Sequence, residues 1–120
     1  MKNKTLVIGA SENEERYSNK AIHRLLAHKH DVVAIGKTAG TVVNVPIITT
    51  MLPLNDIDTV TLYVNPNLQK PYYNYILSLN PRRIIFNPGT ENKELEDMAI
   101  RQGIKTMEAC TLVLLGTGQY

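Results

Sequence analysis

The sequence predicts an α/β fold in which a doubly wound, mainly parallel sheet of about five strands has helices on both faces. Two observations lead to this prediction. Short β-branched apolar runs alternate with segments whose apolar residues recur at helical spacing. The first run, Thr5 to Gly9, ends in a tight Gly9-Ala10-Ser11 turn, and a helical pattern begins near Tyr17-Ser18. Strands separated by helices favour a parallel sheet covered on both sides, so the predicted fold is Rossmann-like.

The remaining elements follow in chain order. Five strand-like runs occupy residues 5–9, 31–35, 42–48, 59–64 and 83–86, and a last strand is expected over 104–107. Pro46 interrupts the third run, which is therefore a short strand or an extended connection. Apolar side chains at helical spacing mark three helices, namely Ala21, Ile22, Leu25 and Leu26, then Tyr72, Ile76 and Leu79, then Leu95, Met98 and Ala99.

Composition favours a single cytoplasmic domain over residues 1–120. An apolar fraction of 43% is ordinary for a folded soluble protein, and the one cysteine excludes an internal disulfide framework. No apolar run approaches the roughly 20 residues of a membrane helix. A net charge of +2, with both signs mixed along the chain, argues against a dedicated nucleic-acid binder. We therefore expect no nucleic-acid or membrane partner, and a homo-oligomer or a protein partner stays open.

Four turn segments follow strands and meet at the carboxyl edge of the predicted sheet, where doubly wound folds bind ligands. They are Gly9-Ala10-Ser11, Gly36-Lys37-Thr38, Val64-Asn65-Pro66 and Asn87-Pro88-Gly89. Such residues also form turns for conformational reasons alone. Their coincidence at one edge nevertheless favours a ligand that carries phosphates, because the first turn offers backbone N–H groups beside a helix N-terminus. Gly9 has no β-carbon to keep a pyrophosphate away from the main chain.

The end of the second strand separates ligand classes. NAD-binding domains place an acidic residue there to accept hydrogen bonds from the ribose. This chain has Gly36 and Lys37, and Asp31 opens the strand at the opposite edge of the sheet. A lysine suits a phosphate on the ribose, as in NADP or coenzyme A, although it is also an ordinary solvated surface residue.

Polar side chains in and after the first loop can add to the backbone donors. Ser11, Arg16 and Ser18 carry hydroxyl and guanidinium groups that suit a diphosphate. Ser18 also suits the N-cap of the first helix, and the two roles are compatible.

The order and spacing of these motifs resemble a known family. Gly9-Ala10-Ser11, Arg16-Tyr17-Ser18, Val64, Asn87-Pro88-Gly89 and Met107-Glu108-Ala109-Cys110 follow one another along nearly the whole chain. In this respect the protein resembles the small stand-alone CoA-binding proteins of bacteria, which are similar to the nucleotide-binding N-terminal domain of the succinyl-CoA synthetase α subunit. The synthetase owes its chemistry to a phosphorylated histidine in a second domain and to another subunit, so the resemblance does not imply that activity.

The resemblance implies that the adenosine diphosphate part of coenzyme A lies across the sheet edge. The first loop would hold the diphosphate, and Gly36 and Lys37 would meet the adenosine and its 3′-phosphate. Many relatives have an Asn-Pro pair where this chain has Gly36-Lys37-Thr38. The full set of expected cofactor-binding residues is Gly9, Ala10, Ser11, Arg16, Ser18, Gly36, Lys37, Val64, Asn65, Asn87, Pro88 and Gly89.

No nucleophile–base pair is readable, so we expect a binding module rather than an enzyme. The three histidines, His23, His28 and His30, match no usual metal-ligand spacing. Cys110 allows a mixed disulfide with a thiol ligand, although a lone cysteine after a buried strand is more often inert. The leading prediction is a CoA-binding module that senses CoA or an acyl-CoA or serves another protein as a subunit. The alternatives are an NADP(H)-binding redox sensor or oxidoreductase and an interaction protein that has lost its ligand.

Overall fold

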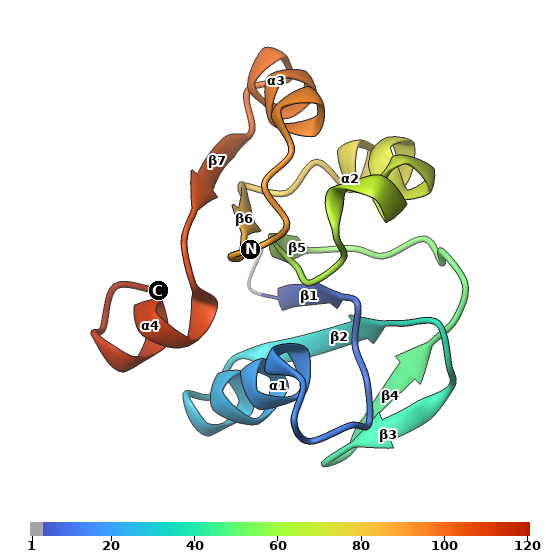
Figure 1. Cartoon of the computed structure of the whole chain (residues 1–120), viewed down its shortest axis with the longest axis vertical. Helices are drawn as coiled ribbons and strands as arrows, with labels where there is room; N and C mark the ends of the chain where they lie inside the picture. The colour runs from blue at the N-terminus through green and yellow to red at the C-terminus, as the bar shows by residue number, and fades with distance from the viewer. Residues whose placement is uncertain (1–3) are drawn as a thin grey trace.

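The computed structural model describes residues 4–120, which form a seven-stranded sheet with helices on both faces (Figure 1). The strands are β1 (Lys4–Ile8), β2 (Asp31–Ile35), β3 (Gly40–Val42), β4 (Val45–Ile48), β5 (Ile57–Leu62), β6 (Arg83–Phe86) and β7 (Lys105–Glu108). The helices are α1 (Tyr17–Ala27), α2 (Tyr73–Leu79), α3 (Lys93–Arg101) and α4 (Thr111–Gly116), and two short 3₁₀ turns, η1 (Pro66–Leu68) and η2 (Lys70–Tyr72), precede α2.

The strand order β3-β4-β2-β1-β5-β6-β7 makes this a doubly wound sheet. The chain runs outward from β1 to β2 and on to the β3–β4 hairpin at the edge, returns to the centre, and continues outward through β5, β6 and β7. All pairings are parallel except that of β3 with β4. The order therefore reverses between β1 and β5, which is where such sheets open a crevice beyond their carboxyl ends.

The predicted α/β class is confirmed, but the predicted strand count of about five is wrong. The run 42–48 is the second half of an antiparallel hairpin, in which Val43 and Asn44 form the turn between β3 and β4. Val43 has a φ of +59°, which is rare for a β-branched residue, so the sequence carried no turn signal there. Pro46 fits because it lies opposite Thr41, before the two residues of β4 that pair with β2.

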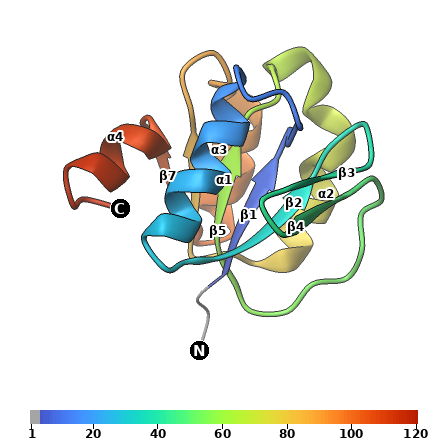
Figure 2. The same ribbon diagram turned by 90° about the horizontal axis from the view of Figure 1, so that it is seen from below.

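Each face of the sheet has its own hydrophobic core. On one face, α1 and α4 pack together over a cluster that includes Val7, Ile22 and Leu25 (Figure 2). On the other face, α2 and α3 contribute Ile76, Leu95 and Ala99 to a cluster with Leu6 and Ile8. Successive residues of β1 thus point to opposite cores, as the pleat of a strand requires. In the described residues, no helix is both long and apolar enough to cross a bilayer.

Candidate functional site

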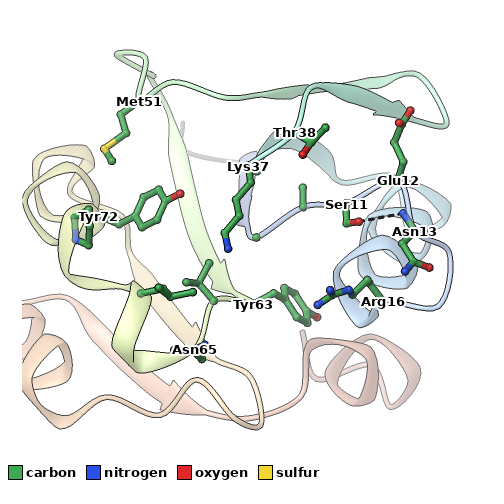
Figure 3. Close-up of a pocket in the computed structure, with 16 residues that line it drawn as sticks. Ser11, Glu12, Asn13, Arg16, Lys37, Thr38, Met51, Tyr63, Asn65 and Tyr72 are labelled. Carbon is green, nitrogen blue, oxygen red and sulfur yellow. Dashed lines mark hydrogen bonds between the residues drawn. The ribbon is translucent and has the colours of Figure 1, made fainter.

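A cleft of about 830 Å³ opens beyond the carboxyl ends of β1, β2 and β5 (Figure 3). This volume is typical of small-molecule sites. Three of the four turn segments expected from the sequence meet here, at the point where the strand order reverses. The lining residues are Gly9, Ala10, Ser11, Glu12, Asn13, Arg16, Gly36, Lys37, Thr38, Met51, Tyr63, Val64, Asn65, Leu68, Pro71 and Tyr72.

Two glycines allow the three strand ends to approach one another. Gly9 has a φ of +98°, and a β-carbon on it would lie 2.8 Å from the carbonyl oxygen of Tyr63. A β-carbon on Gly36 would lie 2.3 Å from the carbonyl oxygen of Ala10. Both distances are too short for real contacts, so these positions require glycine. The space beside Gly9 is filled by backbone, which corrects the expectation that it serves the approach of a pyrophosphate.

The backbone donors of the first loop differ from those expected. The N–H groups of Gly9 and Ala10 both donate to the carbonyl of Ile35, each at 2.9 Å, and so tie the loop to the end of β2. They are therefore not available to a ligand. Within residues 4–120, the amides of Ser11 and Lys37 have no protein acceptor, and both residues line the cleft. The available donors therefore begin at Ser11, the last residue of the predicted turn, and include Lys37 on the β2 side of the cleft.

Side chains hold the first loop in place. The Ser11 hydroxyl accepts from the amide of Asn13 at 3.1 Å, and the Ser11 carbonyl accepts from the side-chain amide of Asn19 at 2.9 Å. A carboxylate oxygen of Glu12 accepts from the backbone amide of Thr41 in β3 at 2.9 Å. Neither Glu12 nor Asn19 was expected from the sequence. Their roles depend on α1 and the hairpin coming together at the loop, which no local pattern signals.

Two cations supply positive charge to the cleft. Lys37 extends into its middle, and Arg16 lies at the end formed by the first loop (Figure 3). In the described part of the chain, neither forms an ion pair or a side-chain hydrogen bond with protein. An anionic ligand can therefore take both without breaking existing pairs.

Ser18 does not lie where the sequence placed it. Its side chain is buried in the first turn of α1 and does not line the cleft. The N-cap of α1 is Arg16, which forms no side-chain capping bond, so the predicted capping role of Ser18 is wrong. The helix begins at Tyr17, so Ser18 is its second residue and not its cap.

Asn87 is buried beneath the sheet edge instead of lining the cleft, and neither Pro88 nor Gly89 lines it. The Asn87 side-chain amide donates to the Thr61 hydroxyl at 2.6 Å and to the Leu62 carbonyl at 2.9 Å. Its oxygen accepts from the backbone amide of Thr111 at 2.9 Å. Asn87 therefore joins β5 and β6 to the start of α4.

We expect Asn87→Ala to lower the free energy of unfolding by about 2–4 kcal/mol, because it leaves several buried polar groups without partners. Thermal and urea unfolding measure this loss. Asn65→Ala is the matched control. It removes an exposed side chain that accepts one hydrogen bond from Asn67 and should cost about 1 kcal/mol or less. Equal losses for both variants would contradict the structural role assigned to Asn87.

Tyr63 lines the cleft, and its hydroxyl is buried. Among residues 4–120 it is the one buried side-chain polar atom without a hydrogen-bond partner. Burial raises the pKa of Tyr63 to about 12. The hydroxyl is therefore protonated at neutral pH.

The other end of the cleft is apolar and was not predicted. Met51 and Tyr72 lie together at this end, opposite Ser11 and Arg16 (Figure 3). Leu68 and Pro71 complete the apolar wall. Tyr72 was expected in a helix, but it ends the η2 turn, where it is half-buried and packs against the core. Met51 belongs to an irregular loop whose position no periodic pattern could indicate.

Other candidate groups do not gather into a second centre. Across residues 4–120, no three His, Cys, Asp or Glu side chains come together as they would to hold a metal. Cys110 is half-buried at the N-cap of α4. The absence of catalytic chemistry stays a prediction.

Comparison with protein families adds the deciding observation: residues 3–116 match the CoA binding domain. The chain belongs to the CoA binding domain family. It is therefore a CoA-binding module with a Rossmann-like α/β fold, as the sequence predicted. A search of curated proteins found no match.

Solved structures share the fold of this CoA-binding module. The chain is 45% identical to a protein described as uncharacterized, with a TM-score of 0.96, covering 100% of this chain and 99% of that one. It is 26% identical to a hypothetical protein from Pyrococcus horikoshii OT3, with a TM-score of 0.84, covering 92% and 80%. A third similar structure is the dinucleotide forming acetyl-coenzyme A synthetase 1 of Ca. Korarchaeum cryptofilum, in complex with phosphate and ADP. It has 17% identity and a TM-score of 0.72, covers 89% of this chain and 25% of that one, and so shares the fold alone.

Proposed function

We propose that the cleft binds coenzyme A, with the adenosine diphosphate part lying across the ends of β1, β2 and β5. The observation that carries the proposal is the polarity of the cleft. One end offers the Ser11 amide and the Arg16 guanidinium, Lys37 lies midway along the cleft, and the other end is an apolar wall; within residues 4–120 neither cation is paired. A nucleotide has the same two halves, because a flat base is joined to charged phosphates.

Each part of the ligand has matching groups along the cleft. The Ser11 amide and the Arg16 guanidinium suit the diphosphate. The Lys37 ammonium, midway along the cleft, suits the 3′-phosphate on the ribose. The apolar wall containing Met51 and Tyr72 suits the adenine ring.

The remaining expected contacts follow from this placement. Val64 and Asn65 border the cleft at the end of β5, where they can contact the ligand between its two halves. Asn87, Pro88 and Gly89 lie outside the cleft lining, so only a part of coenzyme A that extends beyond the cleft could reach the surface near them. Residues 1–120 act in this proposal as one domain.

Binding, rather than chemistry, is the proposed activity. The cleft lining shows no readable nucleophile–base pair, and its two cations, Arg16 and Lys37, suit an anion. The module would accordingly bind or sense CoA or an acyl-CoA, and its cytoplasmic location stays a prediction. Lys37 is also compatible with the 2′-phosphate of NADP, which makes NADP the second ligand to test.

Calorimetric titration of the full chain with CoA, dephospho-CoA, NADP and NAD at near-physiological salt tests the proposal. We expect CoA to bind most tightly and dephospho-CoA to bind more weakly, because the latter lacks the 3′-phosphate. Selective binding of NADP would overturn the assignment of CoA. Absence of heat and of thermal stabilisation with all four ligands would overturn nucleotide binding altogether.

A further inference from the structure

The apolar end of the cleft is formed in part by a loop, residues 49–56, that connects β4 to β5. The loop has no helix or strand of its own. The Leu52 amide donates to the Thr50 carbonyl at 3.1 Å, which makes a tight turn with Met51 at its centre. Met51 lines the cleft from this turn and is 42% exposed.

One side-chain hydrogen bond connects this turn to the rest of the molecule. The Tyr75 hydroxyl, on α2, donates to the Leu52 carbonyl at 2.6 Å. In the described structure, no other side chain hydrogen-bonds to residues 49–56. Further along the loop, Leu54 packs against the core and the Asp56 carbonyl accepts from the Lys4 amide. These later contacts hold the end of the loop, whereas the turn over residues 50–52 is held by the hydrogen bond from Tyr75.

A second hollow of about 330 Å³ borders the same turn. Its lining includes Met51, Pro53, Leu54 and Tyr75. Met51 therefore lines both hollows and is partly exposed, so close packing does not fix its flexible side chain. The bond from Tyr75 to Leu52 is the side-chain hydrogen bond that holds the turn beside the two hollows.

We propose that Tyr75 is a positioning residue for ligand binding: its hydroxyl holds the turn over residues 50–52 so that Met51 packs against the base of the bound nucleotide. This inference rests on the proposed function. Without the hydrogen bond, the turn samples more conformations, and binding must order it again. Tyr75 acts through Met51 and does not itself line the cleft.

Tyr75→Phe removes the hydroxyl and keeps the ring that borders the second hollow. We expect about a threefold to tenfold weaker affinity for CoA, the range that corresponds to one hydrogen bond. Hydrogen exchange of the free variant should be faster at residues 50–54. Tyr73→Phe is the matched control, because it removes another hydroxyl of α2 that hydrogen-bonds to Asn92, away from the cleft. It should leave the affinity for CoA unchanged.

A double-mutant cycle with Met51→Ala separates positioning from general structural damage. If Tyr75 acts through Met51, Tyr75→Phe should weaken CoA binding much less in the Met51→Ala background than in the wild type. The inference would be overturned if Tyr75→Phe lost the same affinity for CoA in both backgrounds, or if Tyr75→Phe bound CoA as tightly as the wild type. In either case, binding of CoA by the wild type would still uphold the proposed function. A wild-type protein that does not bind CoA would instead overturn the proposed function. The hydrogen-exchange measurement does not require ligand. If Tyr75→Phe left exchange at residues 50–54 unchanged, that result alone would show that the Tyr75 hydroxyl does not hold the turn.

Discussion

Gly36→Ala is expected to lower the free energy of unfolding by about 3–5 kcal/mol, a large part of the stability of a typical domain. The new β-carbon would lie 2.3 Å from the Ala10 carbonyl oxygen and 3.0 Å from a methyl carbon of Ile47. The first loop cannot easily retreat, because the amides of Gly9 and Ala10 are bonded to the Ile35 carbonyl. Relief of the clash therefore costs hydrogen bonds as well as packing. Thermal and urea unfolding of the purified variant measure the loss.

Gly116→Ala is the matched control for this substitution. Gly116 is the last residue of α4, and a β-carbon there would meet no atom within 4 Å. Alanine is also the better helix former, so this variant should be as stable as the wild type or more stable by about 0.5–1 kcal/mol. A Gly36→Ala protein that unfolds at the wild-type temperature would show that β1 and β2 have room to separate.

The second large effect is expected at the ligand. Lys37→Ala should weaken binding of CoA by about tenfold to a hundredfold, the range for loss of a hydrogen bond to a charged group. The affinity for dephospho-CoA should change by much less, because that ligand lacks the phosphate assigned to Lys37. The difference should also shrink as salt concentration rises, since Lys37 is exposed. Calorimetry with both ligands at two salt concentrations measures these changes.

Lys105→Ala serves as the control for net charge. Lys105 is an exposed lysine at the start of β7, at the opposite edge of the sheet from the cleft. Its removal should leave both affinities near those of the wild type. If Lys37→Ala weakened CoA and dephospho-CoA equally, Lys37 would not read the 3′-phosphate, and the direction of the ligand along the cleft would have to be reassigned.

The sequence by itself determined the α/β class, the alternation of the main strands with α1, α2 and α3, and the edge of the sheet that holds the cleft, whereas α4 and the β3–β4 hairpin were not predicted. These features follow from local patterns, because apolar periodicity separates strands from helices and parallel strands must end at a common edge. Gly9, Ser11, Gly36 and Lys37 were found in this way and line one cleft. Family membership was also readable, since the motifs keep their order along the chain.

Only the tertiary structure decided what the polar groups at that edge do. The sequence predicted that Asn87 contacts the ligand. In the structure its buried side-chain amide instead forms hydrogen bonds with groups of β5 and α4. The sequence predicted that the Gly9 and Ala10 amides bind the ligand. In the structure both donate to the Ile35 carbonyl at the end of β2. The apolar wall around Met51 likewise depends on how a loop packs against α2. Each of these outcomes rests on contacts between residues distant in sequence, whereas a local pattern records only the preferences of neighbours.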